Sequence, residues 1–280
     1  CLDNGVNFLD TAYCYGVDGE SERLVGETLL RDHRDEFVVA TKCGIHWDGE
    51  GQRVIDGRPE VLKHECLISL QRLQADHVDV LYLHAPDPHV PIAESAGALR
   101  RIQESGRAVT IGASNMTIDQ LAQFHAECPL TVVQPPFNML QRQIEGDLLP
   151  WCRERGISVV IYWPLMKGLL AGKIARNHVF DRDDGRAKYP MFQGEEFQRN
   201  QDFVDALRTV AQRREKTVAQ VVINWTIHQP GITAALCGAK RAYQIDETAA
   251  AMGWQLDEQD LADIAGAIDA RGIPVTRAAV

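Results

Sequence analysis

The stretch that decides the fold is Cys1-Leu-Asp-Asn-Gly5-Val-Asn-Phe-Leu-Asp10, at the start of the chain. Residues 1–5 are typical of the last turn of a helix, because a glycine such as Gly5 commonly takes the left-handed conformation that ends helices. Residues 6–10 form a short apolar run that is typical of a strand. The chain therefore passes from a helix end straight into a strand, and we expect one strand and most of a helix to precede residue 1.

The rest of the chain repeats this alternation of short β-branched runs and longer amphipathic segments, which indicates βαβ units and a parallel sheet. The expected strands are Val6–Asp10, Phe37–Lys42, Val78–His84, Val109–Ser114, Thr131–Gln134, Ser158–Tyr162 and Thr233–Cys237. The expected helices are Ser21–Arg31, Pro59–Leu73, Ile92–Ser105, Thr117–Ala126, Ile144–Arg155, Phe197–Lys216, Tyr243–Met252 and Asp257–Ala270. Ser21 is a candidate N-cap, and Pro59 suits a first helical turn.

Two α/β architectures could contain these seven expected strands. An open doubly wound sheet needs a glycine-rich first turn, which this sequence lacks, whereas a closed barrel needs eight strands. The early strand at residues 6–10 favours the barrel. We predict an α/β protein with a (β/α)8 TIM-barrel fold, of which residues 1–280 lack the first strand and most of the first helix. No linker divides residues 1–280, so we expect a single domain.

Composition excludes several classes of partner. The chain has 280 residues, 45% of them hydrophobic, and a net charge of −10, so it lacks the basic footprint for nucleic acid or anionic membranes. No apolar run approaches the roughly 18 residues of a membrane span. The seven cysteines are scattered and form no C-x-x-C pair, which favours the reducing cytoplasm over a disulfide framework.

Reactive side chains stand at the ends of most expected strands. Because the active sites of such barrels lie at the carboxyl ends of the strands, we expect these residues to converge. They are Asp10, Lys42, His84, Ser114, Asn115, Gln134 and Tyr162, and Tyr15 follows the first strand by five positions.

This set of side chains suits the reduction of a carbonyl group without a metal. A phenol has a pKa of about 10, and a nearby ammonium such as that of Lys42 lowers it, so Tyr15 could act as an acid. Asp10 would keep Lys42 charged, while His84 would donate a hydrogen bond to the same carbonyl oxygen. No side chain supplies a hydride, so this chemistry implies a nicotinamide cofactor.

The motifs, taken in order, resemble those of the aldo-keto reductase family. They are Gly5-Val-Asn-Phe-Leu-Asp10-Thr-Ala-Tyr-Cys-Tyr15-Gly, Val39-Ala-Thr-Lys42, Val80-Leu-Tyr-Leu-His84, Ile111-Gly-Ala-Ser-Asn115, Gln134-Pro-Pro-Phe-Asn138, Tyr162-Trp-Pro-Leu165 and Cys237-Gly-Ala-Lys240. The resemblance covers nearly the whole chain and implies a catalytic tetrad of Asp10, Tyr15, Lys42 and His84, with Tyr15 as the proton donor. It implies reduction of small-molecule aldehydes or ketones to alcohols, with NADPH/NADP+ as the cofactor.

The same resemblance assigns the cofactor contacts. Ser114, Asn115 and Gln134 would hold the nicotinamide carboxamide, and Tyr162 would stack on its ring. Leu165, Gly168 and Leu169 would lie along the pyrophosphate, and Gly238 would begin the adenosine site. Lys240 and Arg241 would meet the adenosine 2′-phosphate, with Gln244 and Glu247 near the adenine and ribose. Tyr13, Trp47 and Trp163 are candidate walls of the substrate pocket.

Other functions fit parts of the same pattern. A Schiff-base aldolase would use Lys42 as its nucleophile. An NADPH-binding regulatory or sensing subunit would keep the motifs and turn over slowly. A metal-dependent hydrolase has less support, because the sequence contains neither H-x-H nor H-E-x-x-H.

Overall fold

The computed structural model describes residues 1–181 and 183–275, which form two compact units. Unit 1 comprises Cys1–Pro135 and Trp151–Val159, and unit 2 comprises Pro136–Pro150 and the described part of Val160–Ala279. Seven parallel strands are hydrogen-bonded in the order β1-β2-β5-β6-β7-β8-β9, and the boundary between the units falls within strand β8 (Ser158–Ile161). All seven strands predicted from the sequence are present, most of them shorter than expected.

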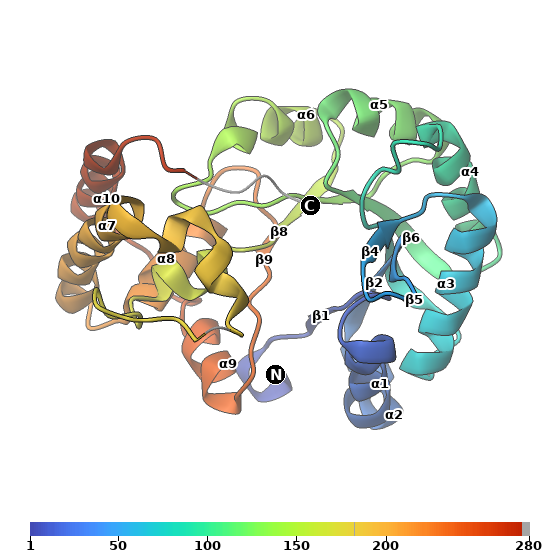
Figure 1. Ribbon diagram of the computed structural model, residues 1–280, viewed down its shortest axis with the longest axis horizontal. Coiled ribbons are helices and arrows are strands. Elements are labelled where there is room, and N and C mark those ends of the chain that lie inside the picture. The colour runs from blue at the N-terminus through green and yellow to red at the C-terminus, as the bar shows by residue number, and fades with distance from the viewer. Residues whose placement is uncertain (182, 276–280) are drawn as a thin grey trace. The chain divides into compact units, whose positions relative to one another are not determined.

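The strands of unit 1 form a parallel sheet that is flanked by helices, as Figure 1 shows for α3 and α4. The strands are β1 (Phe8–Asp10), β2 (Val38–Cys43), β5 (Val78–Leu83), β6 (Ala108–Ser114) and β7 (Val132–Gln134). The helices are α1 (Glu20–Val25), α2 (Arg31–His33), α3 (Pro59–Leu73), α4 (Ile92–Glu104) and α5 (Ile118–Glu127), and α6 (Leu148–Glu154) spans the boundary between the units. Most residues of β2, β5 and β6 are buried, as expected for parallel strands rich in apolar residues.

The ends of the helices decide three local predictions. Gly5 has φ 70° and follows a short 3-10 turn, Leu2–Asn4, which confirms the predicted helix end. Pro59 occupies the first turn of α3, as predicted. The prediction that Ser21 is an N-cap is wrong, because helical turns begin already at Val17 and α1 starts at Glu20. The Ser21 hydroxyl instead accepts a hydrogen bond from that of Thr11 at 2.8 Å.

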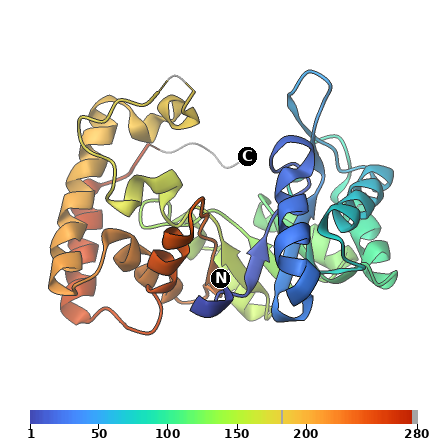
Figure 2. The same ribbon diagram turned by 90° about the horizontal axis from the view of Figure 1, so that it is seen from below.

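A short hairpin after β2 is absent from the sequence prediction. Strands β3 (Ile45–Trp47) and β4 (Arg53–Ile55) pair antiparallel, and their connecting loop is the blue loop at the top of Figure 2. Each strand has three residues, which is too short for an alternating pattern to stand out. The hairpin matters because it brings Trp47 and Arg53 to the candidate site.

The described part of unit 2 contains the end of β8, strand β9 (Ala234–Ala235), the first residues of α6 and four further helices. The helices are α7 (Gly194–Arg213), α8 (Val218–Ile227), α9 (Ala242–Ala249) and α10 (Glu258–Arg271), with 3-10 turns at Gln143–Glu145, Met166–Ala171, Gly185–Lys188 and Pro190–Phe192. Helices α7 and α10 lie side by side (Figures 1 and 2). Within the described ranges, no helix is both long enough and apolar enough to span a membrane.

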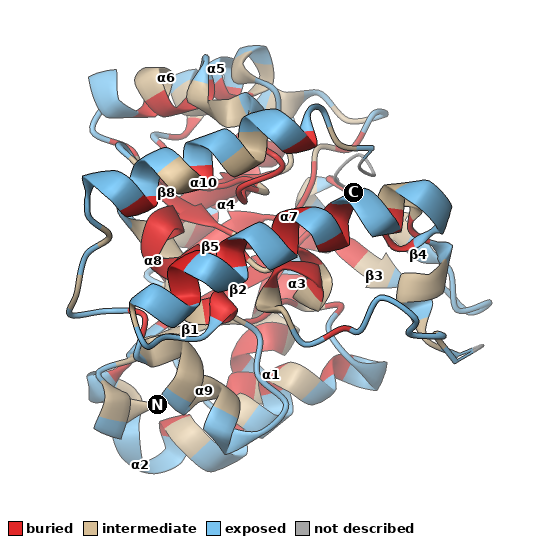
Figure 3. Ribbon diagram, turned by 90° about the vertical axis from the view of Figure 1, so that its left-hand side faces the viewer, coloured by how far each residue is buried: buried red, intermediate tan, exposed pale blue. Residues whose placement is uncertain are grey.

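Among the described residues, α8 is the one long helix that was not predicted from the sequence. Its residues are buried almost throughout (Figure 3), so no polar stripe marks one of its faces. The run Val-Val-Ile at positions 221–223 is also typical of a strand. Thr217 and Gln220 nevertheless form a capping box that starts the helix.

Candidate active site

The register of the unit 1 sheet places five predicted site residues on one face. Asp10 pairs with Ala40, and Lys42 lies two residues beyond Ala40; Lys42 in turn pairs with Tyr82, and His84 lies two residues beyond it. In the next strands Tyr82 pairs with Gly112, and Ser114 lies two residues beyond Gly112. Ser114 pairs with Gln134. Because side chains alternate between the faces with period two, these five residues point to the same side of the sheet at its carboxyl end.

Lys42 and Asp10 form a buried ion pair at the centre of this group. The Lys42 ammonium, whose side chain is 1% exposed, donates to the Asp10 carboxylate and to the carbonyl oxygen of Thr11 at 2.8 Å. Gln134 donates from Nε2 to the other Asp10 oxygen at 2.8 Å. Burial alone would lower the Lys42 pKa, but the charges of Asp10, Tyr15 and Cys14, together with the hydrogen bond to Asp10, raise the pKa above its ordinary value. Lys42 therefore stays charged.

The Tyr15 ring lies beside this charge and contacts the ring of His84. The Lys42 Nζ atom is 5.2 Å from the centroid of the Tyr15 ring, and the Tyr15 and His84 rings meet edge to face at 5.8 Å between centroids. Burial raises the pKa of Tyr15 more than Lys42 lowers it. The prediction from the sequence that Lys42 lowers the pKa of Tyr15 below its ordinary value is thus wrong for the protein without cofactor or substrate. Tyr15 remains 37% exposed, so solvent moderates the rise in its pKa.

His84 is a neutral imidazole. It is 4% exposed, and burial, together with the charges of Lys42 and Arg53, lowers its pKa to about 2. Nδ1 lies 3.7 Å from the Cys14 sulfur. Among the residues that the structure describes, no group is hydrogen-bonded to the other ring nitrogen, Nε2. A neutral ring carries one proton, so His84 can donate one hydrogen bond to a carbonyl oxygen.

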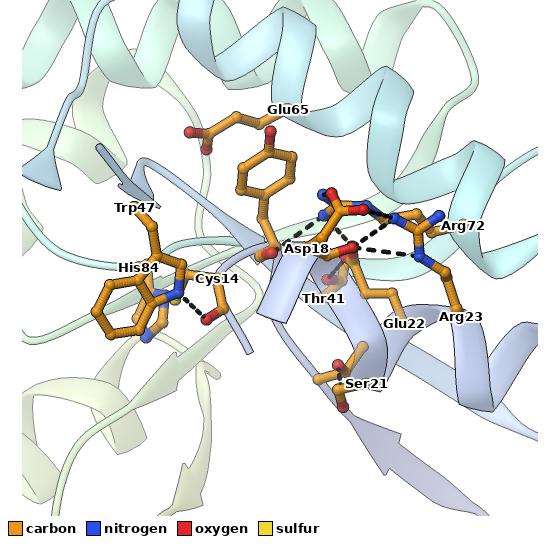
Figure 4. A network of polar contacts seen from close by, with 12 residues as sticks. Cys14, Asp18, Ser21, Glu22, Arg23, Thr41, Trp47, Glu65, Arg72 and His84 are labelled. Carbon is orange, nitrogen blue, oxygen red and sulfur yellow. Dashed lines mark hydrogen bonds and ion pairs between the residues drawn. The ribbon is translucent and has the colours of Figure 1, made fainter. Parts of the chain in front are cut away.

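A buried ion pair anchors the loop that carries Tyr15 (Figure 4). Arg72 bonds the fully buried Glu22 at 3.1 Å, donates to the Tyr13 carbonyl oxygen at 3.1 Å and lies 4.4 Å from the centroid of the Tyr13 ring. Thr41, beside Lys42, donates to the other Glu22 oxygen at 2.6 Å. Sequence reasoning missed this network, because nothing local links Glu22 to a residue 50 positions away. Tyr13, predicted as a pocket wall, thus packs against Arg72.

The other predicted residues of unit 1 bond to neighbouring strand ends. The Ser114 hydroxyl donates to the Gln134 carbonyl oxygen at 2.7 Å. Asn115 has φ 57° and donates from Nδ2 to the His84 carbonyl oxygen at 2.9 Å and to Ser114 Oγ at 3.1 Å. Trp47 of the hairpin donates from Nε1 to the Cys14 carbonyl oxygen at 2.9 Å. These bonds fix the loops around the ion pair.

The predicted cofactor residues of unit 2 fall into two groups, of which the first surrounds Tyr162. The rings of Tyr162 and Trp163 meet edge to face at 5.5 Å, and the Lys167 ammonium is 4.6 Å from the centroid of the Trp163 ring. Asn138 is buried and donates to the Trp163 carbonyl oxygen at 3.2 Å, so it supports this loop. Leu165 precedes the 3-10 turn Met166–Ala171, and within that turn Leu169 is fully buried.

The second group follows β9. The side-chain oxygen of Gln244 accepts hydrogen bonds from the backbone N–H groups of Lys240 at 2.7 Å and Arg241 at 3.0 Å. These bonds fix the start of α9. Glu247 forms an ion pair with Lys173. Lys240 and Arg241 are exposed and, within the described ranges, neither makes an ion pair.

These residues fit a dinucleotide phosphate. Gly168 has φ 91°, a conformation that favours glycine. A Cβ atom added at Gly168 would have an Arg186 nitrogen at 3.8 Å as its nearest neighbour. A side chain at Gly238 would meet no atom within 4 Å. Accessible backbone beside cations suits phosphate binding. In the part of the chain that the structure describes, no group of three His, Cys, Asp or Glu side chains is placed to hold a metal ion.

Comparison with known proteins matches nearly the whole chain to one family. Residues 1–269 match the model of the Aldo/keto reductase family. The aldo-keto reductase YhdN of Bacillus subtilis is 35% identical over 265 residues, which cover 94% of this chain and 80% of that protein. The NADH-specific methylglyoxal reductase of Escherichia coli is 33% identical over 268 residues, which cover 91% of this chain and 81% of that protein.

A solved structure extends the match to the fold. The glycerol dehydrogenase AKR11B4 from Gluconobacter oxydans superposes with a TM-score of 0.90 at 32% identity, over 100% of this chain and 86% of that one. The parallel sheet of seven strands with surrounding helices, seen with this likeness, confirms the predicted barrel-like (β/α)8 fold. This protein is a member of the aldo/keto reductase family of oxidoreductases.

Proposed function

We propose that the chain reduces aldehydes or ketones to alcohols, with NADPH as the hydride donor and Tyr15 as the general acid. The observation that carries the proposal is the buried Lys42–Asp10 pair, with the rings of Tyr15 and His84 beside it. The bound cofactor would supply a hydride to the carbonyl carbon. The direct test is consumption of NADPH that depends on an added aldehyde or ketone.

The residues of unit 1 would handle the oxygen of the substrate. Tyr15 would give its proton to the carbonyl oxygen as negative charge develops there, while His84 would donate a hydrogen bond to the same atom. The tyrosinate left behind would lie near the Lys42 ammonium, which Asp10 and Gln134 hold in place. Burial raises the pKa of Tyr15 and so keeps the phenol protonated until negative charge develops on the carbonyl oxygen of the substrate.

The charge of Lys42 also bears on the aldolase alternative. A Schiff-base nucleophile must be a neutral amine, whereas Asp10, helped by Tyr15 and Cys14, raises the Lys42 pKa above its ordinary value despite burial. The ammonium already donates to Asp10 and to the Thr11 carbonyl oxygen. Reduction is therefore the better-supported reaction. A sensing subunit with little turnover would have the same site, and only measured turnover distinguishes it.

The preference for NADPH rests on the exposed side chains of Lys240 and Arg241. Replacing both with Ala is expected to weaken NADPH binding about 10- to 100-fold, because hydrogen bonds to a charged group contribute about 1.5–3 kcal/mol. Binding of NADH, which lacks the 2′-phosphate, is expected to change little. Titration of tryptophan fluorescence with each cofactor at fixed salt measures both affinities.

A matched variant separates this effect from a general loss of charge. Lys63→Ala with Arg101→Ala removes two exposed cations from α3 and α4 and is expected to leave both affinities unchanged. Equal weakening of NADPH and NADH by the Lys240 and Arg241 substitutions would refute a 2′-phosphate site. Because one relative is named for NADH specificity, tighter binding of NADH by the unmodified chain would transfer the proposal to that cofactor.

A further inference from the structure

The thiol of Cys14 lies between two nitrogen groups at the candidate active site. Its sulfur is 3.7 Å from His84 Nδ1 and 3.3 Å from Arg53 Nη2. Cys14 is 3% exposed, and Trp47 holds its backbone through the 2.9 Å bond to its carbonyl oxygen. In Figure 4 the side chains of Cys14, Trp47 and His84 lie together. This arrangement bears directly on which His84 nitrogen carries the proton.

The donor inventory of the three groups fixes the direction of their hydrogen bonds. A guanidinium can only donate, so the Cys14 sulfur accepts from Arg53. If His84 also donated from Nδ1, the sulfur would accept two hydrogen bonds. Its own buried S–H would then have no acceptor in either of these two neighbouring groups. If the thiol donates to Nδ1 instead, the buried S–H has an acceptor, Nδ1 has a donor, and the sulfur still accepts from Arg53.

The charge states of the two groups agree with this direction. Burial raises the pKa of the Cys14 thiol, and Arg53 opposes this only in part, so the sulfur keeps its proton. Burial together with the nearby cations lowers the pKa of His84 to about 2, so the ring is neutral and carries a single proton. A thiolate–imidazolium pair, as in a nucleophilic cysteine, is thereby disfavoured.

We propose that Cys14 is a positioning residue that donates its S–H to His84 Nδ1 and so holds the imidazole proton on Nε2. In the proposed reduction, on which this role rests, Nε2–H is then available to the carbonyl oxygen. Two residues of the hairpin β3–β4 hold Cys14 in place. Arg53 donates a hydrogen bond to its sulfur, and Trp47 donates one to its carbonyl oxygen.

The position of the proton can be measured without any turnover. Long-range 1H–15N NMR of the full chain labelled with [15N]histidine distinguishes Nε2–H from Nδ1–H, and His84→Gln identifies the His84 signals by their loss. The expected result is the Nε2–H form in the unmodified chain and a mixture of both forms in Cys14→Ala. Cys14→Ser keeps a donor at this position and is expected to retain more of the Nε2–H form than Cys14→Ala.

Turnover gives a second readout. Cys14→Ala is expected to lower kcat for carbonyl reduction about twofold to tenfold, the size of one ordinary hydrogen bond, with little change in cofactor affinity. Cys152→Ala removes another buried thiol, on α6, and controls for the lost volume.

Three outcomes would overturn the assignment. They are an Nδ1–H form in the unmodified chain, an unchanged Nε2–H form in Cys14→Ala, and identical proton positions in the Ser and Ala variants. Because the NMR measurement needs no substrate, this assignment can stand or fall independently of the proposed reaction.

Discussion

Replacing Tyr15 with Phe is expected to lower kcat for carbonyl reduction by about two to four orders of magnitude, the usual contribution of a general acid. The substitution removes one oxygen and keeps the ring, so the contacts with His84 and Lys42 persist. The Lys42 ammonium is also 5.7 Å from the centroid of the Tyr82 ring, but Tyr82 is fully buried and burial raises its pKa, so Tyr15 is the better candidate for the acid. The measurement is kcat and KM with saturating cofactor.

The binding step provides the control for Tyr15→Phe. Quenching of tryptophan fluorescence by NADPH is expected to match that of the unmodified chain, because the phenol oxygen acts on the substrate. Tyr243→Phe, at an exposed tyrosine of α9, is expected to leave both binding and turnover unchanged. Near-normal turnover by Tyr15→Phe would refute its assignment as the acid.

Replacing Lys42 with Met is expected to lower kcat by about two to three orders of magnitude, because a buried charge that stabilises a developing anion is lost. Met keeps most of the length of the side chain and lacks the ammonium. The tyrosinate formed during the reaction would then face Asp10 without a compensating cation. The measurement is kcat as a function of pH. We expect the residual activity to rise as the pH falls, because an external proton source then replaces the Tyr15 acid.

The Lys42 variant also separates reduction from aldol chemistry. Borohydride treatment with a carbonyl substrate would attach that substrate to Lys42 only if the residue formed a Schiff base. We expect no such adduct. Lys63→Met, at an exposed lysine of α3, is the matched control and should behave like the unmodified chain. An adduct that disappears in Lys42→Met would favour the aldolase instead.

The positions of three of the proposed catalytic residues could be predicted from the sequence because they follow from strand ends. Asp10, Lys42 and His84 each end a short apolar run, and the alternation of side chains with the register between the strands places them on one face. The link from Gln134 to Asp10 spans 124 positions and depends on the order of the strands around the sheet, which composition does not reveal.

Other features depend on packing that no local pattern encodes. Glu22 and Arg72 look like ordinary charged residues of two helices, yet they form a buried pair beneath the Tyr15 loop. Helix α8 lacks a polar face because it is buried on nearly all sides, so its sequence is also typical of a strand. Cys14 reads as a small buried hydrophobe until the hairpin brings Arg53 to its sulfur. The predicted direction of the Tyr15 pKa shift was wrong for the same reason. The sequence identified the charge of Lys42, but the burial that outweighs it depends on packing.

The most direct test of the proposed function follows the hydride itself. NADPH or NADH carrying deuterium at both C4 positions would be incubated with the chain and a set of small aldehydes and ketones, and the alcohols formed would be analysed by mass spectrometry. We expect one deuterium on the carbinol carbon of at least one product, and at least about a hundredfold less labelled alcohol when Tyr15→Phe replaces the unmodified chain over the same time. Saturable quenching by a cofactor, without labelled alcohol from any substrate, would contradict the proposed reductase.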